Sequence, residues 1–283
     1  MAVELRGSVA ADVPELGRVC YEAFRDIAER HGFPPDFPNE AVAQSVVGLL
    51  VQQEAVYAVG AWEGAVARGS NHIAMWDEVA GLGPISVDVG SQGEGIGRRL
   101  MEDVIAHARE RGFERIRLMQ DAFNMRSLAL YASLGFETKE PVAYIELAAG
   151  GAADANVRGA TAADVPAMDA LCREVYGISR AHEVAALMGA GFPAFVLDRG
   201  RIAGYLIGTA IGHGVAEDEG VMLALYGSLG TAIPGMLSNL PIREGGLYRA
   251  ALAAGHRNRK VMNLMALGPY EEPRGTWTPS VLF

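Results

Sequence analysis

Cysteine, positive charge and long apolar runs are scarce in this sequence, and each shortage excludes a class of protein. The chain has only two cysteines, Cys20 and Cys172, far apart in the sequence, which favours reduced, buried thiols over a disulfide. The 24 Lys and Arg residues face 34 Asp and Glu residues, and a net charge of −10 argues against a nucleic-acid partner. Apolar runs such as 46–51 fall far short of the ~20 residues that cross a membrane.

The N-terminal segment carries charges where a signal peptide would have its apolar core. We therefore expect a cytoplasmic protein without a membrane partner. A chain of 283 residues with 50% hydrophobic and 20% charged residues is a folded globular protein, long enough for two domains.

The chain repeats itself once. Residues 5–20 return as residues 157–172, with 8 of 16 positions identical, and each copy places a cysteine at its last position. Both copies read as a strand, a polar turn and a helix that begins near an Asp-Val-Pro triplet. The repeat predicts two domains of similar topology, 1–148 and 157–283, joined by a linker of small residues, 149–156.

The first copy mixes helical and strand patterns, which predicts an α/β (α+β) fold. Helices are expected over about 12–30, 40–51, the segment ending near 111, and 126–134; a hairpin is expected at Glu63-Gly64; strands are expected at 83–89, 115–120 and 143–148. The loop 31–40 is rich in proline and cannot be helical.

A glycine-rich stretch, Gln92 to Arg99, joins the strand at 83–89 to the helix that follows it. Arg98 stands where a dinucleotide fingerprint needs its third glycine, and no lysine follows as a P-loop would require. Glycines at a helix N-terminus expose amides at the positive end of the helix dipole, a site for a pyrophosphate. The alternative is an ordinary glycine-rich turn with surface arginines.

Two motifs together resemble the GNAT superfamily of N-acyltransferases. The first is the Q/R-x-x-G-x-G/A motif, matched by Gln92, Gly95 and Gly97. The second is a segment that the family writes N-x-x-A-x-x-L-Y-x-x-x-G-F, matched by Asn124, Tyr131, Gly135 and Phe136, with Ser127 in place of the usual alanine. The resemblance covers roughly 1–148. It implies two tandem GNAT-like domains, each a mixed, mostly antiparallel sheet flanked by helices, and the second domain is expected to be degenerate.

The resemblance also implies roles for individual residues. It assigns acetyl-CoA binding to Val87, Val89, Gln92, Gly93, Gly95, Ile96, Gly97, Arg98, Asn124 and Tyr131, with no metal. The backbone of Val87 and Val89 would pair with the pantetheine arm, the amides from Gly93 to Arg98 would hold the pyrophosphate, and Tyr131 would protonate the leaving thiolate. Asn124 would orient acetyl-CoA or merely cap the helix at 126–134.

The sequence offers several candidates for the general base and for the acceptor site. Candidate bases are Asp77, Glu78, Asp88, Asp121 and His72, and a water chain would serve equally well. Candidate walls of an acceptor pocket are Phe33, Phe37, Asn71 and Trp76, although aromatic residues more often belong to a core.

The second copy lacks the Q-x-x-G-x-G motif; the segment that could correspond to it, 236–255, offers only Gly245-Gly246 after an arginine and a glutamate. Residues 267–283 are interpreted as a final strand, with a cleft wall or a homodimer contact as alternatives. The sequence thus predicts an N-acetyltransferase that moves an acetyl group to a small-molecule amine by direct attack through a tetrahedral intermediate. A protein or peptide acetyltransferase and an acetyl-CoA sensor without turnover are the alternatives.

Overall fold

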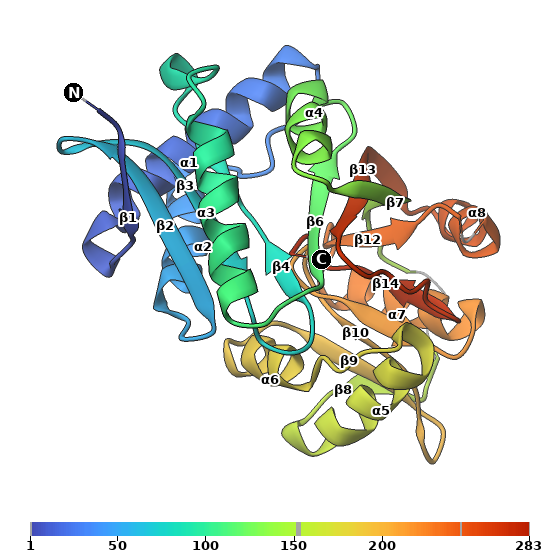
Figure 1. The fold of residues 1–283 in the computed structure, drawn as a ribbon. Helices are drawn as coiled ribbons and strands as arrows, with labels where there is room; N and C mark the ends of the chain where they lie inside the picture. The colour runs from blue at the N-terminus through green and yellow to red at the C-terminus, as the bar shows by residue number, and fades with distance from the viewer. Residues whose placement is uncertain (1, 151–153, 244, 283) are drawn as a thin grey trace. The chain divides into compact units, whose positions relative to one another are not determined.

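The computed structural model describes residues 2–150, 154–243 and 245–282, and these form two compact units (Figure 1). Unit 1 contains the described residues up to Leu118, Phe123–Glu137 and Leu282. Unit 2 contains Met119–Ala122 and the described residues of Thr138–Val281. Residues 151–153 of the predicted linker lie outside the described residues.

Unit 1 is a sheet with helices on both faces. Its elements are β1 (Glu4–Gly7), η1 (Ala10–Asp12), α1 (Val13–Arg30), α2 (Glu40–Gln52), β2 (Val56–Glu63), β3 (Val66–Ala74), β4 (Ala80–Leu82), β5 (Ser86–Val87), η2 (Val89–Ser91), α3 (Ile96–Glu110), the first part of β6 (Ile116–Asp121) and α4 (Met125–Ser133). The strands follow the order β1-β2-β3-β4-β6, with β5 also paired to β3, and only β4 and β6 run parallel.

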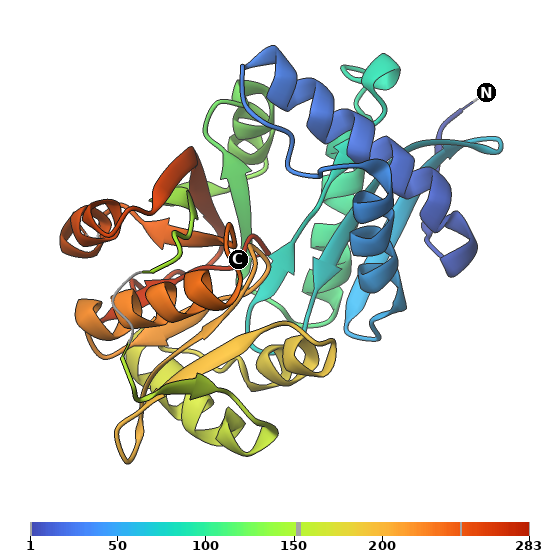
Figure 2. The same ribbon diagram turned by 180° about the vertical axis from the view of Figure 1, so that it is seen from behind.

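Helices α1 and α2 cover one face of this sheet and α3 covers the other, as the two opposite views show (Figures 1 and 2). Successive residues of β3 point to opposite faces. Asn71 donates a hydrogen bond to the Leu100 carbonyl of α3 at 3.3 Å. Its neighbour Ser70 faces the other way: its hydroxyl lies 3.4 Å from that of Ser86, and Ser86 is hydrogen-bonded to Cys20 of α1. The glycine-rich stretch therefore leaves the sheet between these two helical layers.

The sequence repeat is also a repeat of structure. Arg6 donates to both carboxylate oxygens of Asp12 at 2.7 Å, and Arg158 donates to both oxygens of Asp164 at 2.8 and 2.9 Å. In each copy this aspartate precedes a long helix with proline in its first turn, α1 and its counterpart α5 (Val165–Tyr176). The paired start of the two copies follows from identical residues at identical spacing.

Unit 2 contains most of the second copy and one strand of the first. Its elements, besides α5, are β7 (Glu137–Glu146), β8 (Val157–Gly159), η3 (Ala162–Asp164), α6 (Ala181–Gly189), β9 (Ala194–Asp198), β10 (Ile202–Ile207), β11 (Gly214–Ala216), α7 (Glu219–Ala232), β12 (Leu237–Pro241), α8 (Gly245–Ala253), β13 (Arg257–Leu267) and β14 (Thr276–Thr278). Strands β14-β11-β10-β9-β8 form an antiparallel sheet, and β7 lies between β13 and β12.

The predicted α/β (α+β) fold is confirmed, with two differences in detail. The single strand expected at 83–89 is wrong: β4 ends at Leu82 and β5 covers only Ser86–Val87, because Pro84 has no N–H for the ladder. The last strand of the first copy, β7, begins at Glu137 and pairs with β12 in unit 2. The compact units therefore differ from the repeat limits, and 1–148 and 157–283 stay predictions for the domains. The expected final strand is present as β14.

Candidate active site

The turn between β5 and α3 has a backbone that only glycine adopts without strain. Gly93 has φ +94° and Gly95 has φ +83°, both in the region that side chains disfavour. Gly95 is the N-cap of α3, and no side chain caps this helix. Residues 93–95 are exposed, so the turn offers its backbone to solvent.

The uncapped start of α3 is an anion site by its geometry. The first backbone bond of the helix runs from the Arg99 amide to the Gly95 carbonyl at 3.1 Å. The amides of Ile96, Gly97 and Arg98 therefore have no carbonyl one turn earlier, and they lie at the positive end of the helix dipole. Helix α2 shows the contrast, because Asn39 caps it by accepting from the Val42 amide at 3.0 Å. These residues fit a diphosphate group.

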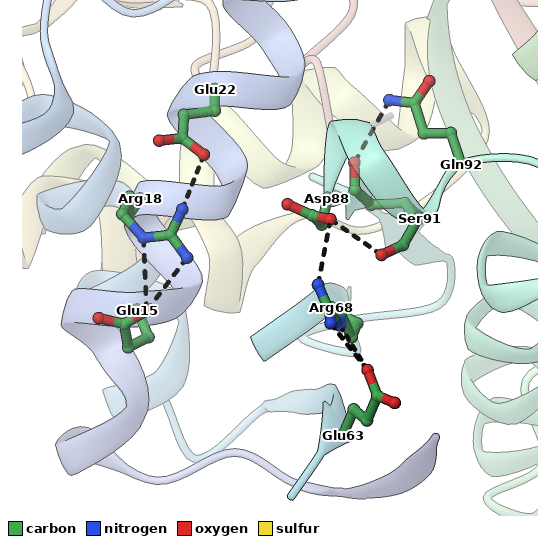
Figure 3. Close-up of polar contacts among 9 residues, drawn as sticks. Glu15, Arg18, Glu22, Glu63, Arg68, Asp88, Ser91 and Gln92 are labelled. Atoms are coloured by element: carbon green, nitrogen blue, oxygen red, sulfur yellow. Dashed lines mark hydrogen bonds and ion pairs between the residues drawn. The ribbon is translucent and has the colours of Figure 1, made fainter. Parts of the chain in front are cut away.

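Gln92 ties this turn to its surroundings. Its Nε2 donates to the Val87 carbonyl at 3.3 Å, and its Oε1 accepts from Arg126 Nη1 at 2.8 Å (Figure 3 shows the first of these). Val87 is in the strand β5, where it lies opposite Gly69, but Val89 is in the 3-10 turn η2. Of the two residues expected to pair with pantetheine, only Val87 thus has strand geometry.

A network of charges holds the segment between β5 and the turn (Figure 3). Asp88 accepts from Ser91 Oγ at 2.9 Å and pairs with Arg68 at 3.5 Å, and Arg68 pairs with Glu63 at 2.7 Å. The Arg68 guanidinium lowers the pKa of the Glu63 carboxyl. The Asp88 carboxylate is therefore committed to fixing the turn.

Helix α4, which carries Tyr131, packs on the start of α3. A Cβ on Gly97 would lie 3.6 Å from Leu130 Cδ2, and Arg98 Nη2 donates to Ser133 Oγ at 2.6 Å. The contact of Arg126 with Gln92 adds a third link between the two helices. The two sequence motifs, about thirty residues apart, are thus brought together in unit 1.

Tyr131 is buried on α4, with 6% of its surface exposed, and its ring centroid lies 6.2 Å from that of Phe136. Gly135, with φ +92°, ends the helix and lets the Phe136 amide return to the Tyr131 carbonyl at 3.0 Å. Asn124 begins the helix by accepting from the Ser127 amide at 3.1 Å. This contact favours the capping role among the two expected for Asn124.

Among the candidate bases, His72 has the most distinctive environment. It is fully buried, its Nδ1 lies 2.9 Å from the Pro84 carbonyl, and its Nε2 has no hydrogen-bond partner among the described residues. Nδ1 is therefore the protonated nitrogen, and Nε2 carries a lone pair. Burial lowers the pKa of His72 to about 4, so the ring is neutral at physiological pH.

Two further carboxylate candidates, Glu78 and Asp121, have cationic neighbours. Glu78 lies 3.7 Å from Arg115, and Asp121, in unit 2, pairs with Lys260 at 2.6 Å. Asp77 lies in the bend after β3. Ion pairing stabilises a carboxylate in its charged form and makes it a weaker base.

The four candidate wall residues have different environments. Phe33 is stacked on Phe123, with centroids 4.3 Å apart and planes 12° apart. Phe37 packs edge-on against Phe24 at 5.3 Å and adjoins the core of α1 and α2. Asn71 is fully buried and holds α3, while Trp76 is half-buried in the bend after β3.

The sequence interpretation did not include Phe123 or Arg126. Phe123 directly precedes the matched segment, and Arg126 lies inside it but at a position where the motif specifies no residue. Their partners, Phe33 and Gln92, are distant in the sequence. No local pattern therefore indicated either residue.

The second copy has lost the whole glycine-rich stretch. Residues 83–95 separate β4 from α3, but only Glu217 and Asp218 separate β11 from α7, the helix at the same place in the element order. Asp218 caps α7 by accepting from the Val221 amide at 2.9 Å. A carboxylate of the chain itself thus occupies the helix start that an anion would need.

The segment suggested as the second copy's counterpart, 236–255, was placed wrongly, because its glycines begin α8, which corresponds to α4. These two helices end with the same hydrogen bond. The His256 amide donates to the Ala251 carbonyl at 3.1 Å, just as the Phe136 amide donates to the Tyr131 carbonyl. Gly255, with φ +88°, matches Gly135. Ala251 therefore stands at the position of Tyr131.

Residues 19–136 match the sequence model of the acetyltransferase (GNAT) family. This stretch of the chain is similar to GNAT acetyltransferases. The match includes both motifs and lies almost wholly within unit 1. It is consistent with acyl transfer as the chemistry of this part of the chain.

Relatives extend the likeness to the whole chain. Over 141 residues it is 28% identical to the mycothiol acetyltransferase of Catenulispora acidiphila, a match that covers 47% of this chain and 38% of that protein. A protein from Pyrococcus horikoshii assigned as an acetyltransferase has a TM-score of 0.80 at 15% identity, covering 97% of this chain and 92% of its own.

A tandem GNAT protein from the clavulanic acid biosynthesis pathway has a TM-score of 0.59 at 16% identity, covering 95% of this chain and all (100%) of its own. At such identities the likeness shows the fold. The tandem GNAT architecture expected from the repeat is thereby confirmed.

The described residues contain neither a membrane-spanning helix nor a cluster of metal ligands. No helix in these ranges has both the length and the apolar character of a membrane span. Across the same part of the chain, no group of three or more His, Cys, Asp or Glu side chains could hold a metal ion.

Proposed function

We propose that this GNAT protein is an acetyl-CoA-dependent N-acetyltransferase that acts on an amine of a small molecule. The observation that carries the proposal is the junction of α3 and α4. There an uncapped helix N-terminus with two glycines of positive φ is packed against the helix of Tyr131. An anion site and a proton donor on adjoining helices are the parts that this chemistry needs.

Bound acetyl-CoA would supply the activated acetyl group as a thioester. In unit 1, the amides of Gly93 to Arg98 bind the diphosphate, and Gln92 keeps the turn in place through the Val87 carbonyl. Val87 has strand geometry, and its backbone is proposed to pair with the pantetheine arm of the ligand. The Tyr131 hydroxyl supplies the proton to the leaving sulfur.

His72 Nε2 is proposed to accept a hydrogen bond from the water or amine that gives up the proton; with a pKa of about 4 the ring is too weak a base to hold that proton at neutral pH. Its Nε2 lone pair is held in one orientation by the bond of Nδ1 to Pro84. His72 lies on β3, two residues from Ser70 and therefore on the same face of the sheet. Two carboxylate candidates, Asp88 in the segment before the turn and Glu78 between β3 and β4, have arginine partners.

Unit 2 is proposed to bind no CoA and to have no catalytic role. It lacks the glycine-rich stretch, its α7 is capped by Asp218, and Ala251 replaces the tyrosine. We propose the domain limits 1–148 and 157–283 for the two GNAT-like copies.

The test is a panel of amines incubated with the purified chain and acetyl-CoA, with release of free thiol as the signal. The panel holds small aliphatic amines, amino acids and amine-bearing antibiotics, with a parallel set of peptides. Thiol release with a small amine supports the proposal. Release with peptides alone would indicate a peptide acetyltransferase, and binding of acetyl-CoA without turnover across both sets would indicate a sensor.

A further inference from the structure

The side chain of Arg126 lies over the first residues of the glycine-rich turn. Arg126 is exposed in the first turn of α4, and its Nη1 donates to Gln92 Oε1 at 2.8 Å. Its Nη2 lies 3.3 Å from the place where a Cβ on Gly93 would be. The guanidinium is therefore against the backbone that offers its amides to an anion.

The charge of Arg126 is not balanced by any carboxylate among the described residues, since its hydrogen bond is to the neutral amide of Gln92. Nearby arginines differ in this respect. Arg68 is held by Glu63 and Asp88, and Arg18 by Glu15 and Glu22 (Figure 3).

The two arginines in the first turn of α3 have other partners. Arg98 lies 3.6 Å from Glu102 and donates to Ser133, and Arg99 donates to the Val3 carbonyl at 2.9 Å. In a chain of net charge −10, an unbalanced cation at an uncapped helix N-terminus concentrates positive potential at one place.

We propose that Arg126 binds the diphosphate of CoA directly, exchanging the Gln92 oxygen for a phosphate oxygen. The inference rests on the proposed function, because it assigns a further residue to the same site. An arginine binds phosphate through two parallel N–H donors, and such charge-assisted bonds are stronger than a bond to an amide oxygen. Gln92 keeps its own bond to Val87, so the turn need not change when Arg126 exchanges partners.

The position of the guanidinium favours the diphosphate over the 3′-phosphate of CoA as its partner. Arg126 reaches Gln92 and Gly93, which begin the same turn whose following amides, from Ile96 to Arg98, face the anion. A group held by those amides is within the reach of Arg126.

The test compares CoA with 3′-dephospho-CoA by calorimetry on the wild-type chain and four variants. Arg126→Ala removes the cation, Arg126→Lys keeps a charge, and Arg126→Gln keeps a neutral donor for Gln92. Arg111→Ala is the matched control, because it removes an exposed arginine at the opposite end of α3, about 22 Å away. Thermal unfolding of each variant checks that it is folded.

We expect Arg126→Ala to weaken both ligands by the same factor, about 10-fold, the usual value of one hydrogen bond to a charged group. Arg126→Gln should be as weak as the alanine variant, whereas Arg126→Lys should recover part of the affinity and Arg111→Ala should bind as the wild type does. The penalty of the alanine variant should shrink as salt rises.

Three outcomes would overturn the inference. Unchanged CoA affinity in folded Arg126→Ala would remove the residue from the site. Full affinity in Arg126→Gln would show that it acts only by holding Gln92. A penalty for CoA that disappears with 3′-dephospho-CoA would assign the residue to the 3′-phosphate. Failure of the wild-type chain to bind either ligand would instead overturn the proposed function, and so the two failures are distinguishable.

Discussion

Replacing Tyr131 by phenylalanine separates a proton donor from a core side chain. The ring stays buried on α4, keeps its packing near Phe136 and leaves Gly97 and Leu130 in contact across the two helices. The anion site is made of backbone amides and cations, so affinity for acetyl-CoA should change little. Only the phenolic hydroxyl, and with it the proton, is lost.

If the hydroxyl supplies that proton, turnover should fall by about 10² to 10⁴-fold, the usual effect of removing a positioned acid. That range corresponds to roughly 3–5 kcal/mol of transition-state stabilisation. A tyrosine with only a structural role would instead cost about 1 kcal/mol of stability for one lost hydrogen bond and leave turnover intact.

The assay is thiol release at saturating acetyl-CoA, with an accepted amine or with slow hydrolysis of acetyl-CoA as the reaction. Tyr57→Phe is the matched control. The Tyr57 hydroxyl donates to Asp103 of α3 at 2.9 Å, and Tyr57 belongs to neither sequence motif. That variant should lose stability without losing turnover. Wild-type turnover in Tyr131→Phe would refute the assignment of Tyr131 as the acid.

Three other predictions concern the anion site, the second copy and a buried histidine. Gly95→Glu should abolish CoA binding in a folded chain because it places a carboxylate at the helix start, whereas Gly112→Glu, with φ +85° and equally open space at the other end of α3, should bind CoA normally. Calorimetry should find one CoA per chain, and two equivalent sites would contradict a degenerate unit 2. His72 has a folded pKa of about 4 against 6.5 when unfolded, so the unfolded chain binds the extra proton between these values and stability falls as pH falls through that window. The loss between pH 7 and pH 5 should be about 2 kcal/mol by urea unfolding, and it should be absent in His72→Gln; an equal loss in that variant would assign the effect to other groups.

The sequence predicted the helices well because their signals are local. Proline and aspartate at the start of α1 and α5, and glycine after α3 and α4, act within one or two turns of the backbone. The strand at 83–89 was predicted less well. Whether it stays in the ladder depends on pairing with β3, and the apolar pattern does not reveal that Pro84 interrupts this pairing.

The candidate site divides in the same way. The glycine spacing before a helix pointed to Gln92, Gly93 and Gly95, and the resemblance to the family's second motif pointed to Tyr131. Spacing did not locate Arg126, since its link to Gln92 depends on how α4 packs on α3.

By itself, the sequence determined that the chain is a tandem of two related α/β copies and that the first carries a glycine-rich helix start. Both properties depend on residues a few positions apart in the sequence, where backbone sterics and hydrogen bonding act directly. Only the tertiary structure decided that β7 of the first copy pairs with β12 in unit 2, that α7 follows β11 after two residues and is closed by Asp218, and that an unbalanced arginine lies over the glycine turn. Those outcomes depend on contacts between segments far apart in the chain, whose free energy is set by packing and charge in the folded protein.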